Sequence, residues 1–408
     1  MIKKIKFGFE LIRTSCNQPS HIRVILKDIF KSDNKIYSNK DHLKSAMEWL
    51  CKAQDVTGCS GVSAAYRLNK GWESPFPETT GYIIPTFIDY ASLVNDNSYI
   101  ERAVKMGEWE TEIQLPSGAV MGRGCNSNPI VFDTGQVIFG WISLYKETNM
   151  NKFLDAAVKA GDWLISIQDD DGKWSKHTFN GIPHTYNTRV AWSLLEIYNV
   201  TKDEKYKDAA ERNILWALGN AKENGWFTQM GFTVNENKSP LTHTIAYTLR
   251  GLLESSSYLG GKTKENILDI VQKASENIMV SCGFRGKRGS HFRPTYLPGT
   301  FDKNWESKDN YSCLTGNVQI AIIWLKLYQI NNDARLLNAA LKTIDKVKTR
   351  QFIDSKNPGI RGGIPGSYPV WGSYNPFTYP NWATKFFADA IMLQESIIRK
   401  SGKRKMKD

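Results

Sequence analysis

The chain has 408 residues, of which 41% are hydrophobic and 12% aromatic, enough for one large core or two ordinary ones. It contains no run of about eighteen uncharged apolar residues and no signal-peptide pattern, so the sequence predicts neither a membrane span nor a signal peptide. The net charge of +12 is concentrated at the two ends: residues 1–40 carry +6 and residues 399–408 carry +5.

The basic ends are interpreted as solubilising tails or as a contact with an anionic membrane surface. The sequence contains no recognisable nucleic-acid motif, so nucleic acid is not a predicted partner. Six scattered cysteines without a CxxC pair are typical of a reduced cytoplasmic protein. We therefore predict a cytoplasmic protein. The alternative is a protein that contacts the membrane surface through its basic ends.

An internal repeat organises the chain between these ends. Six times, a threonine that we interpret as a helix N-cap is followed by an apolar helical run. These runs are apolar on nearly all sides, which favours the inside of the molecule. The aligned threonines are Thr80, Thr134, Thr188, Thr244, Thr315 and Thr384.

Each of these runs is preceded by an amphipathic helix with apolar residues at i, i+3 and i+4. In the first three repeats this helix carries a tryptophan and, five residues later, a glutamine: Trp49 and Gln54, Trp109 and Gln114, Trp163 and Gln168. The fourth repeat keeps only Trp216, and the fifth and sixth lose the pair. We predict that these helices form the outside of the molecule.

Twelve helices in this alternating order form either an open superhelix or a closed ring. An open array needs polar capping repeats, and the first and last runs are as apolar as the middle ones. We therefore predict an all-α fold of six helical hairpins in a ring around a central cleft, an (α/α)6 toroid. Its predicted boundaries are residues 41–398, between a basic N-terminal segment at 1–40 and a basic tail at 399–408.

Residues 160–174, AGDWLISIQDDDGKW, resemble the QW repeat of terpenoid cyclases and protein prenyltransferases. The resemblance places the chain in the α/α-toroid superfamily, which also includes six-hairpin glycosidases, sugar epimerases and polysaccharide lyases. The cyclase pattern itself is incomplete, since Asp169, Asp170 and Asp171 lie in a predicted solvated turn and no aligned zinc ligands occur. Terpenoid chemistry stays as an alternative.

In a toroid the loops before the inner helices meet at one face and form the mouth of the cleft. Polar residues next to the aligned threonines should therefore converge there, near free helix N–H groups. The residues that we predict at this mouth are Glu78, Asp133, Asn187, Arg189, His243, Asn317, Asn381 and Lys385.

The third repeat is the richest of these, with His184, Tyr186, Asn187 and Arg189 within six positions. Related uronate lyases combine the same residue types. By analogy Asn187 and Arg189 would hold a sugar carboxylate, while His184, Tyr186 or His243 serve as base and acid. A hydrolase would instead need two carboxyls, for which Asp133 is the best placed, and Glu78, Glu73 and Glu306 are the candidate partners.

The long loops of the fifth and sixth repeats combine aromatic residues and arginines, which suit sugar rings and acidic substituents. The residues that we predict to bind substrate there are Arg293, Trp305, Tyr311, Arg361 and Trp371. An alternative is that the aromatic side chains only close one end of the ring.

The leading hypothesis is a carbohydrate-active enzyme on an oligo- or polysaccharide containing uronic acid, by β-elimination, epimerisation or hydrolysis. His184, Tyr186, His243 and Asp133 are the predicted catalytic residues. The alternatives are a terpenoid-cyclase-like or prenyltransferase-like enzyme and a non-catalytic glycan-binding toroid. No nucleotide, metal or other cofactor motif occurs, so we predict none.

Overall fold

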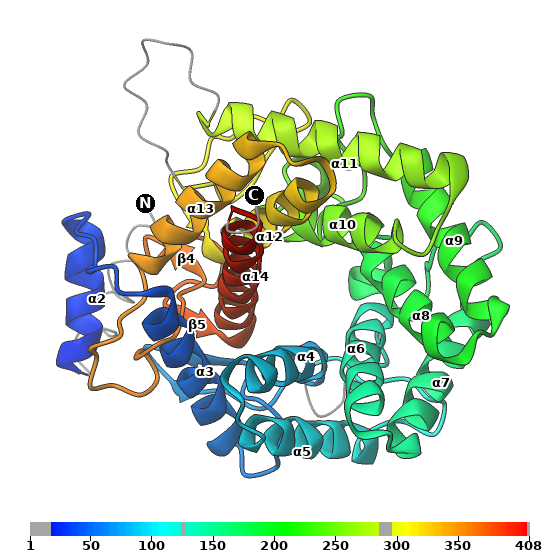
Figure 1. Cartoon of the computed structure of the whole chain (residues 1–408), viewed down its shortest axis with the longest axis horizontal. Helices are drawn as coiled ribbons and strands as arrows, with labels where there is room; N and C mark the ends of the chain where they lie inside the picture. Colours follow the sequence, from blue (N-terminus) through cyan, green and yellow to red (C-terminus); the bar gives the residue numbers. More distant parts are fainter. Residues whose placement is uncertain (1–17, 124–127, 285–295, 406–408) are drawn as a thin grey trace.

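The protein forms a closed ring of helices (Figure 1). The structure, a computed structural model, describes residues 18–123, 128–284 and 296–405. The inner helices of the ring are α4 (Pro77–Val94), α6 (Val131–Thr148), α8 (Thr188–Thr201), α10 (Thr242–Ser255), α12 (Leu314–Asn331) and α14 (Asn381–Lys405). The outer helices are α3 (Asn39–Asp55), α5 (Ser98–Glu112), α7 (Asn151–Ser166), α9 (Glu204–Gly219), α11 (Gly261–Ser281) and α13 (Ala334–Lys348). The predicted all-α toroid is confirmed.

Burial explains why the two sets of helices differ in sequence. An inner helix packs against the inner helices on either side and against the outer layer, so large residues such as Trp141 and Trp324 are completely buried. An outer helix has solvent on one side and buries a single stripe, as Phe153, Ala157 and Leu164 do in α7. Buried side chains from both layers form one continuous hydrophobic cluster.

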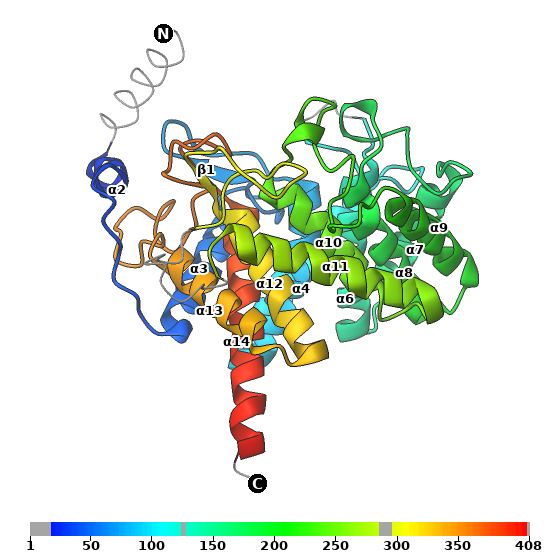
Figure 2. The same ribbon diagram turned by 90° about the horizontal axis from the view of Figure 1, so that it is seen from above.

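The connections on the two faces of the ring differ in length. From α4 to α13, each inner helix is joined to the outer helix that follows it by only two to five residues. Four of these turns begin with a residue in the left-handed conformation, namely Asn95, Asn149, Lys202 and Asn332, which stops the inner helix. The connections from an outer helix back to an inner helix are long, and they gather on the other face (Figure 2).

The ring closes where its last inner helix meets its first hairpin. Helix α14 packs against both α3 and α4, so α3 is paired with the last helix of the ring. On the loop face, β1 (Ala65–Arg67) pairs with β2 (Gly71–Trp72) and with β5 (Thr378–Pro380) in an antiparallel sheet. A second pair, β3 (Ser312–Cys313) with β4 (Ser367–Tyr368), joins the loops of repeats five and six.

The aligned threonines have a different role from the one that we predicted. None of the six is an N-cap, because each lies within the first turn of its helix. The hydroxyls of Thr80, Thr134 and Thr384 accept hydrogen bonds from the backbone N–H groups of Val62, Val120 and Ile364 at 2.9–3.0 Å. These threonines therefore anchor the incoming long loop to the inner helix.

The glutamines of the Trp/Gln pairs connect successive outer helices. The Nε2 groups of Gln54, Gln114 and Gln168 each donate to a carbonyl in the following loop and to a carbonyl of the next outer helix. Gln351 makes the same pair of contacts, to Gly362 and to His42 of α3, across the point where the ring closes. Repeat six therefore retains the glutamine function, although we predicted its loss together with the tryptophan.

Helix α2 (Pro19–Ile29) lies outside the ring, in the segment that we predicted as a basic N-terminal region (Figure 1). It buries His21, Val24 and Ile25, and His21 Nε2 lies 3.3 Å from Tyr66 Oη. At the other end, α14 continues to Lys405, past the predicted toroid boundary at residue 398. Within the described ranges, no helix is both long and apolar enough to cross a membrane.

Candidate active site

Four neighbouring inner helices bring ionisable residues together beneath the long loops. Glu78 and Asp133 lie in the first turns of α4 and α6. Arg189 and His243 occupy the corresponding positions in α8 and α10. The charges of Asp133 and Arg189 both act on Glu78, and that of Arg189 acts on His243. These four residues, predicted from repeats far apart in sequence, form one cluster.

The two carboxyl groups of this cluster both resist ionisation. Burial raises the pKa of Asp133 to about 8. Burial, followed by the negative charge of Asp133, raises the pKa of Glu78 well above its ordinary value, and Arg189 opposes this only partly. Both residues occupy first helical turns, where the helix dipole favours a negative charge, so desolvation outweighs the dipole here. The pair therefore retains a proton at neutral pH.

Arg189 is a buried cation without an acidic partner. Its Nε donates to Gln136 Oε1 at 2.8 Å, and its guanidinium lies 4.9 Å from the ring centre of Tyr247 and 5.4 Å from that of Trp192. No carboxylate in the described ranges forms an ion pair with it, although the charge of Glu78 acts on it. Burial lowers its pKa from the ordinary value.

His243 is held as a neutral imidazole. Its Nδ1 lies 2.9 Å from Gln319 Oε1, which can only accept, so Nδ1 carries the proton. Burial lowers the pKa of His243 to about 4, and the nearby charge of Arg189 acts in the same direction. Nε2 makes no hydrogen bond within the described part of the chain and is left as a potential proton acceptor.

Three tyrosines surround these groups. Tyr186 packs edge-on against Phe132, and burial together with the charges of Asp133 and Glu78 raises its pKa well above the ordinary value. Tyr82 and Tyr247 follow Glu78 and His243 by one helical turn, and burial raises the pKa of each. All three hydroxyls stay protonated at neutral pH and can act as donors.

Asn187 is buried next to this cluster with unused hydrogen-bonding capacity. It is 1% exposed, and neither its Oδ1 nor its Nδ2 has a hydrogen-bond partner. Buried polar groups are almost always paired, so an unpaired amide calls for an explanation.

His184 belongs to the scaffold of the loops. Its Nδ1 lies 3.0 Å from the carbonyl of Gly231 and its Nε2 lies 2.7 Å from that of Phe179. Its ring stacks on Tyr186 with 4.4 Å between centroids. Both ring nitrogens are occupied by backbone groups, so His184 positions Tyr186 and has no free nitrogen for proton transfer.

Several other predicted binding residues also hold loops. All hydrogen bonds of the Asn317 side chain go to Leu297, Ser312 and Cys313, and Asn381 Nδ2 donates to Ser63 and Thr79. Trp305 is 2% exposed, and its Nε1 donates to the carbonyl of Asn224 at 3.0 Å. These groups have no polar atoms left for a substrate, apart from Asn381 Oδ1, which is unpaired.

The remaining predictions fall at different places. Lys385 is near the ring centre and pairs with Asp389. Tyr311 and Trp371 are half-buried within the loops. Arg361 borders a surface pocket with Glu48 and Arg102 of the outer layer, away from the cluster. Arg293 lies outside the described residues.

Sequence reasoning missed three groups. Tyr82 and Tyr247 could have been found, because each stands four residues after a predicted site residue on the same helix. Glu110 of the outer helix α5 gave no such signal. It is completely buried with both carboxyl oxygens unpaired, and burial followed by the charge of Asp133 raises its pKa well above the ordinary value.

Within the described ranges, no three His, Cys, Asp or Glu residues are grouped so that they could hold a metal ion. The groups gathered beneath the long loops are two carboxyls with raised pKa values, a neutral imidazole, tyrosine hydroxyls and one buried guanidinium. These groups can transfer protons and orient an oxygen-rich ligand.

An (α/α)6 toroid with such an acid-bearing mouth belongs to the class of toroidal carbohydrate-active enzymes. Residues 39–355 match the model of the β-L-arabinofuranosidase GH127 catalytic domain, and the chain is a member of that family. It is thus an enzyme that acts on glycans. A search of curated proteins gives no match.

Solved structures share the whole architecture. A heparin-specific unsaturated glucuronyl hydrolase is similar with a TM-score of 0.69 and 14% identity, over 88% of this chain and 98% of the other. Cellobiose 2-epimerase from Bacillus thermoamylovorans gives 0.64 and 15%, over 86% and 97%. An α-amylase from Clostridium perfringens gives 0.60 and 13%, over 88% and 99%. At these identities the likeness concerns the fold.

Proposed function

We propose that the protein hydrolyses a glycosidic bond and that Glu78 and Asp133 are its catalytic pair. The observation that carries this proposal is that two carboxyls from adjacent inner helices both have raised pKa values and that the charge of one acts on the other. Most glycosidases use two carboxyls, one to protonate the leaving oxygen and one to activate water or attack the anomeric carbon. The hydrolase name of the family supports this reaction type.

Glu78 is the proposed general acid, because the charge of Asp133 helps to keep it protonated. Asp133 is the proposed base or nucleophile, since its pKa of about 8 allows it to ionise first. Tyr186, which stays protonated, would donate a hydrogen bond to the developing negative charge. Asn187 would use its unpaired amide to bind a sugar hydroxyl or carboxylate.

Arg189 is the basis for proposing an acidic sugar as substrate. A buried cation is ordinarily paired, and this one has only the neutral Gln136 as its hydrogen-bond partner. A substrate carboxylate near Glu78 would supply the missing counter-charge. The glucuronyl hydrolase with the same fold supports this substrate class, while the family name points to a neutral arabinofuranoside as the competitor.

Two matched substrates and four variants test the proposal. We expect Glu78→Gln and Asp133→Asn to lower kcat/KM by about a thousandfold or more on any cleaved substrate. Arg189→Gln should raise KM for an unsaturated glucuronyl disaccharide and leave p-nitrophenyl β-L-arabinofuranoside unaffected. Asp171→Asn, in an exposed turn, is the control. Hydrolysis that survives in both carboxyl variants of a folded protein would refute the pair.

His243 supports a second candidate function, proton transfer at a sugar carbon in epimerisation or β-elimination. Its Nε2 is unprotonated and free of hydrogen bonds among the described residues, as a general base requires. This reaction would incorporate solvent deuterium into the sugar or produce an unsaturated uronate, and His243→Ala would abolish it. Hydrolysis predicts incorporation of solvent oxygen instead.

We also propose that α2 binds an anionic membrane surface. Ile22, Leu26, Ile29 and Phe30 form a stripe on the outward side of this helix, and Phe30 is 75% exposed. Arg23, Lys27 and Lys31 flank the stripe, within a segment that carries +6 overall. An exposed apolar stripe with basic flanks is the pattern of an interfacial helix.

Vesicle sedimentation tests this second proposal. The protein should bind vesicles of phosphatidylcholine with phosphatidylserine and not vesicles of phosphatidylcholine alone, and added salt should weaken the binding. Leu26→Ser with Phe30→Ser should abolish binding. Leu215→Ser, which removes an equally exposed leucine from α9, should not. Equal binding by the double variant and the wild type would contradict the proposal.

A further inference from the structure

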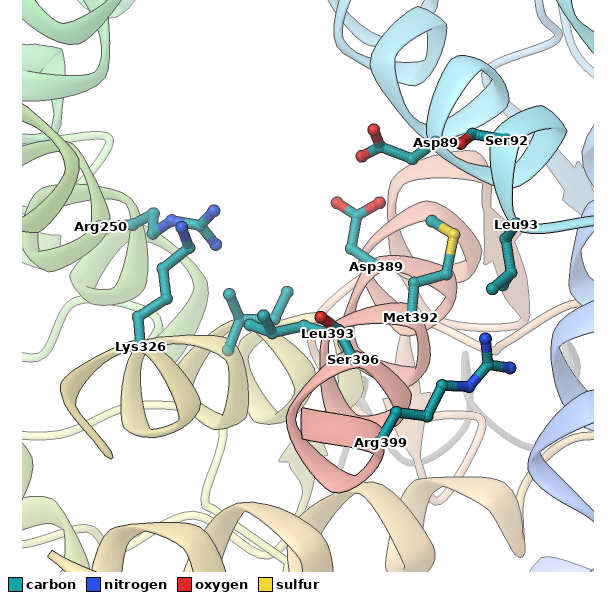
Figure 3. Close-up of a pocket in the computed structure, with 11 residues that line it drawn as sticks. Asp89, Ser92, Leu93, Arg250, Lys326, Asp389, Met392, Leu393, Ser396 and Arg399 are labelled. Atoms are coloured by element: carbon teal, nitrogen blue, oxygen red, sulfur yellow. The ribbon is translucent and has the colours of Figure 1, made fainter. Parts of the chain in front are cut away.

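A second cavity opens at the end of the ring opposite the long loops. It has a volume of about 560 Å³ and lies among the C-terminal halves of α4, α10, α12 and α14 (Figure 3). A smaller cavity of about 240 Å³ shares four of its lining residues and reaches inward to Tyr82 and Arg189. A space of this size suits a ligand as large as a mono- or disaccharide.

This cavity is distinct from the carboxyl cluster. Tyr82 stands one helical turn below Glu78, and Arg189 forms the wall next to it. Neither Glu78 nor Asp133 lines the second cavity. Tyr82 and Arg189 therefore stand between this cavity and the carboxyl cluster.

Charges of opposite sign face one another across the second cavity. Arg250 of α10 and Lys326 of α12 project from one side, and Asp89 of α4 and Asp389 of α14 project from the other (Figure 3). These charges give the cavity a cationic wall and an anionic wall, which suits a charged ligand.

Most of these charges satisfy one another. Glu254 accepts from Arg250 Nε at 2.5 Å and from Lys326 Nζ at 2.6 Å. Asp389 accepts from Lys385 and, at 2.7 Å, from Thr86 Oγ1.

Three lining groups are left over. The terminal nitrogens of Arg250, the carboxylate of Asp89 and the guanidinium of Arg399 make no hydrogen bond within the described part of the chain. Arg250 and Asp89 lie on opposite walls, and Asp89 and Arg399 are both exposed (Figure 3).

We propose that this cavity binds a small zwitterionic ligand, an amino sugar that carries a carboxylate. Its carboxylate would pair with the fork of Arg250 and its ammonium group with Asp89. An uncharged ligand would leave both protein groups unpaired, and a ligand with one charge would satisfy only one of them. The site is independent of the proposed hydrolysis.

The environment of Asp89 supports an ammonium partner. Partial desolvation, and then repulsion by the charge of Asp389, raise the pKa of the exposed Asp89 to about 6. A cationic group between them would relieve this repulsion. The C-terminal ends of the inner helices, which also face this mouth, favour positive charge there.

Calorimetric titration of the intact protein with muramic acid, a zwitterionic amino sugar acid, tests the proposal. Glucosamine, glucuronate and N-acetylglucosamine supply the cationic, anionic and neutral controls. We expect muramic acid to bind at least about tenfold more tightly than each of these. Asp89→Asn and Arg250→Gln should each remove that advantage, whereas Arg102→Gln, which alters an ion pair on the outer layer, should retain it.

Two further results decide between sites. Asp133→Asn should leave muramic acid binding unchanged, since it alters only the carboxyl cluster. If binding is lost in Asp133→Asn and kept in Asp89→Asn, the ligand occupies the loop face, and the proposal is overturned. Equal affinity for muramic acid and N-acetylglucosamine would overturn it as well. Neither outcome bears on whether Glu78 and Asp133 hydrolyse glycans.

Discussion

At the scale of single residues, Asp133 illustrates how burial sets the chemistry of the site. Its carboxyl group is 7% exposed in the first turn of a helix, yet desolvation raises its pKa to about 8. An exposed aspartate at a helix N-terminus would ionise near pH 4 or below. Because both carboxyls have raised pKa values, they are protonated at neutral pH, and Asp133 becomes a base only as the pH approaches 8.

The pH dependence of activity follows from this. If Asp133 must ionise and Glu78 must stay protonated, kcat/KM should rise as the pH approaches 8 and fall only when Glu78 loses its proton above that. Initial rates between pH 4 and pH 10 would show this profile. An optimum near pH 5 would mean that the carboxyls titrate normally and that their burial is relieved in the working enzyme.

The same shift has a consequence for stability. The folded state binds the Asp133 proton more tightly than the unfolded state, so ionisation of Asp133 destabilises the folded protein. This destabilisation is absent below pH 4, grows between pH 4 and 8, and is complete above pH 8. We expect Asp133→Asn to increase the free energy of unfolding at pH 8 by on the order of 5 kcal/mol and to change it little at pH 4. Urea unfolding at the two pH values measures the difference. A variant less stable at both would show that the carboxyl has an essential structural contact.

At the scale of elements, the aligned threonines explain how loops of different lengths reach one common mouth. In three repeats the loop donates a backbone N–H to the threonine hydroxyl of the inner helix that it enters. This bond fixes the loop close to the first turn, where Glu78 and Asp133 lie. The repeated threonine thus helps to position the site by binding the backbone of the incoming loop.

Thr134→Val tests this role. The change keeps the shape of the side chain and leaves the N–H of the buried Val120 without a partner, which should cost about 1–3 kcal/mol of unfolding free energy. Thr134→Ser keeps the hydroxyl and should cost less. Amide hydrogen exchange at Val120 provides the direct readout, with faster exchange in the valine variant. Unchanged exchange would show that the hydrogen bond does not hold the loop.

The sequence predicted the ring because the signal repeats six times along the chain, and it predicted Glu78, Asp133, Arg189 and His243 because each stands near an aligned threonine. It could not show that both nitrogens of His184 bind backbone carbonyls or that Asn317 is fully bonded to a loop, since such contacts depend on how loops fold back. Asp89 and Arg250 looked like ordinary charges on a helix, and only the closure of the ring turned them toward one another.

At the scale of the whole molecule, closure rests on contacts between segments at opposite ends of the ring. Gln351 donates to Gly362 and to the carbonyl of His42, and its Oε1 lies 2.5 Å from His42 Nδ1. Gln114 makes the equivalent contacts within the body of the ring, where it is less buried.

Gln351→Met should therefore destabilise the protein more than Gln114→Met. We expect a loss of about 2–4 kcal/mol for the first and about 1–2 kcal/mol for the second, because the buried site leaves more polar groups unpaired. Urea unfolding measures both. Equal losses of unfolding free energy would show that the Gln351 contact stabilises the ring no more than the Gln114 contact does.

The pairing of α3 with α14 also bears on how the protein is made. Helix α3 leaves the ribosome long before its partner α14. Its apolar stripe, which includes Leu43, Met47 and Leu50, therefore stays exposed to solvent while the five intervening hairpins fold. During that interval a nascent chain exposes the surface that a second nascent chain could occupy with its own α14. Because ring closure covers α3 only when α14 has been made, we expect the nascent chain to need protection of the apolar face of α3 until then.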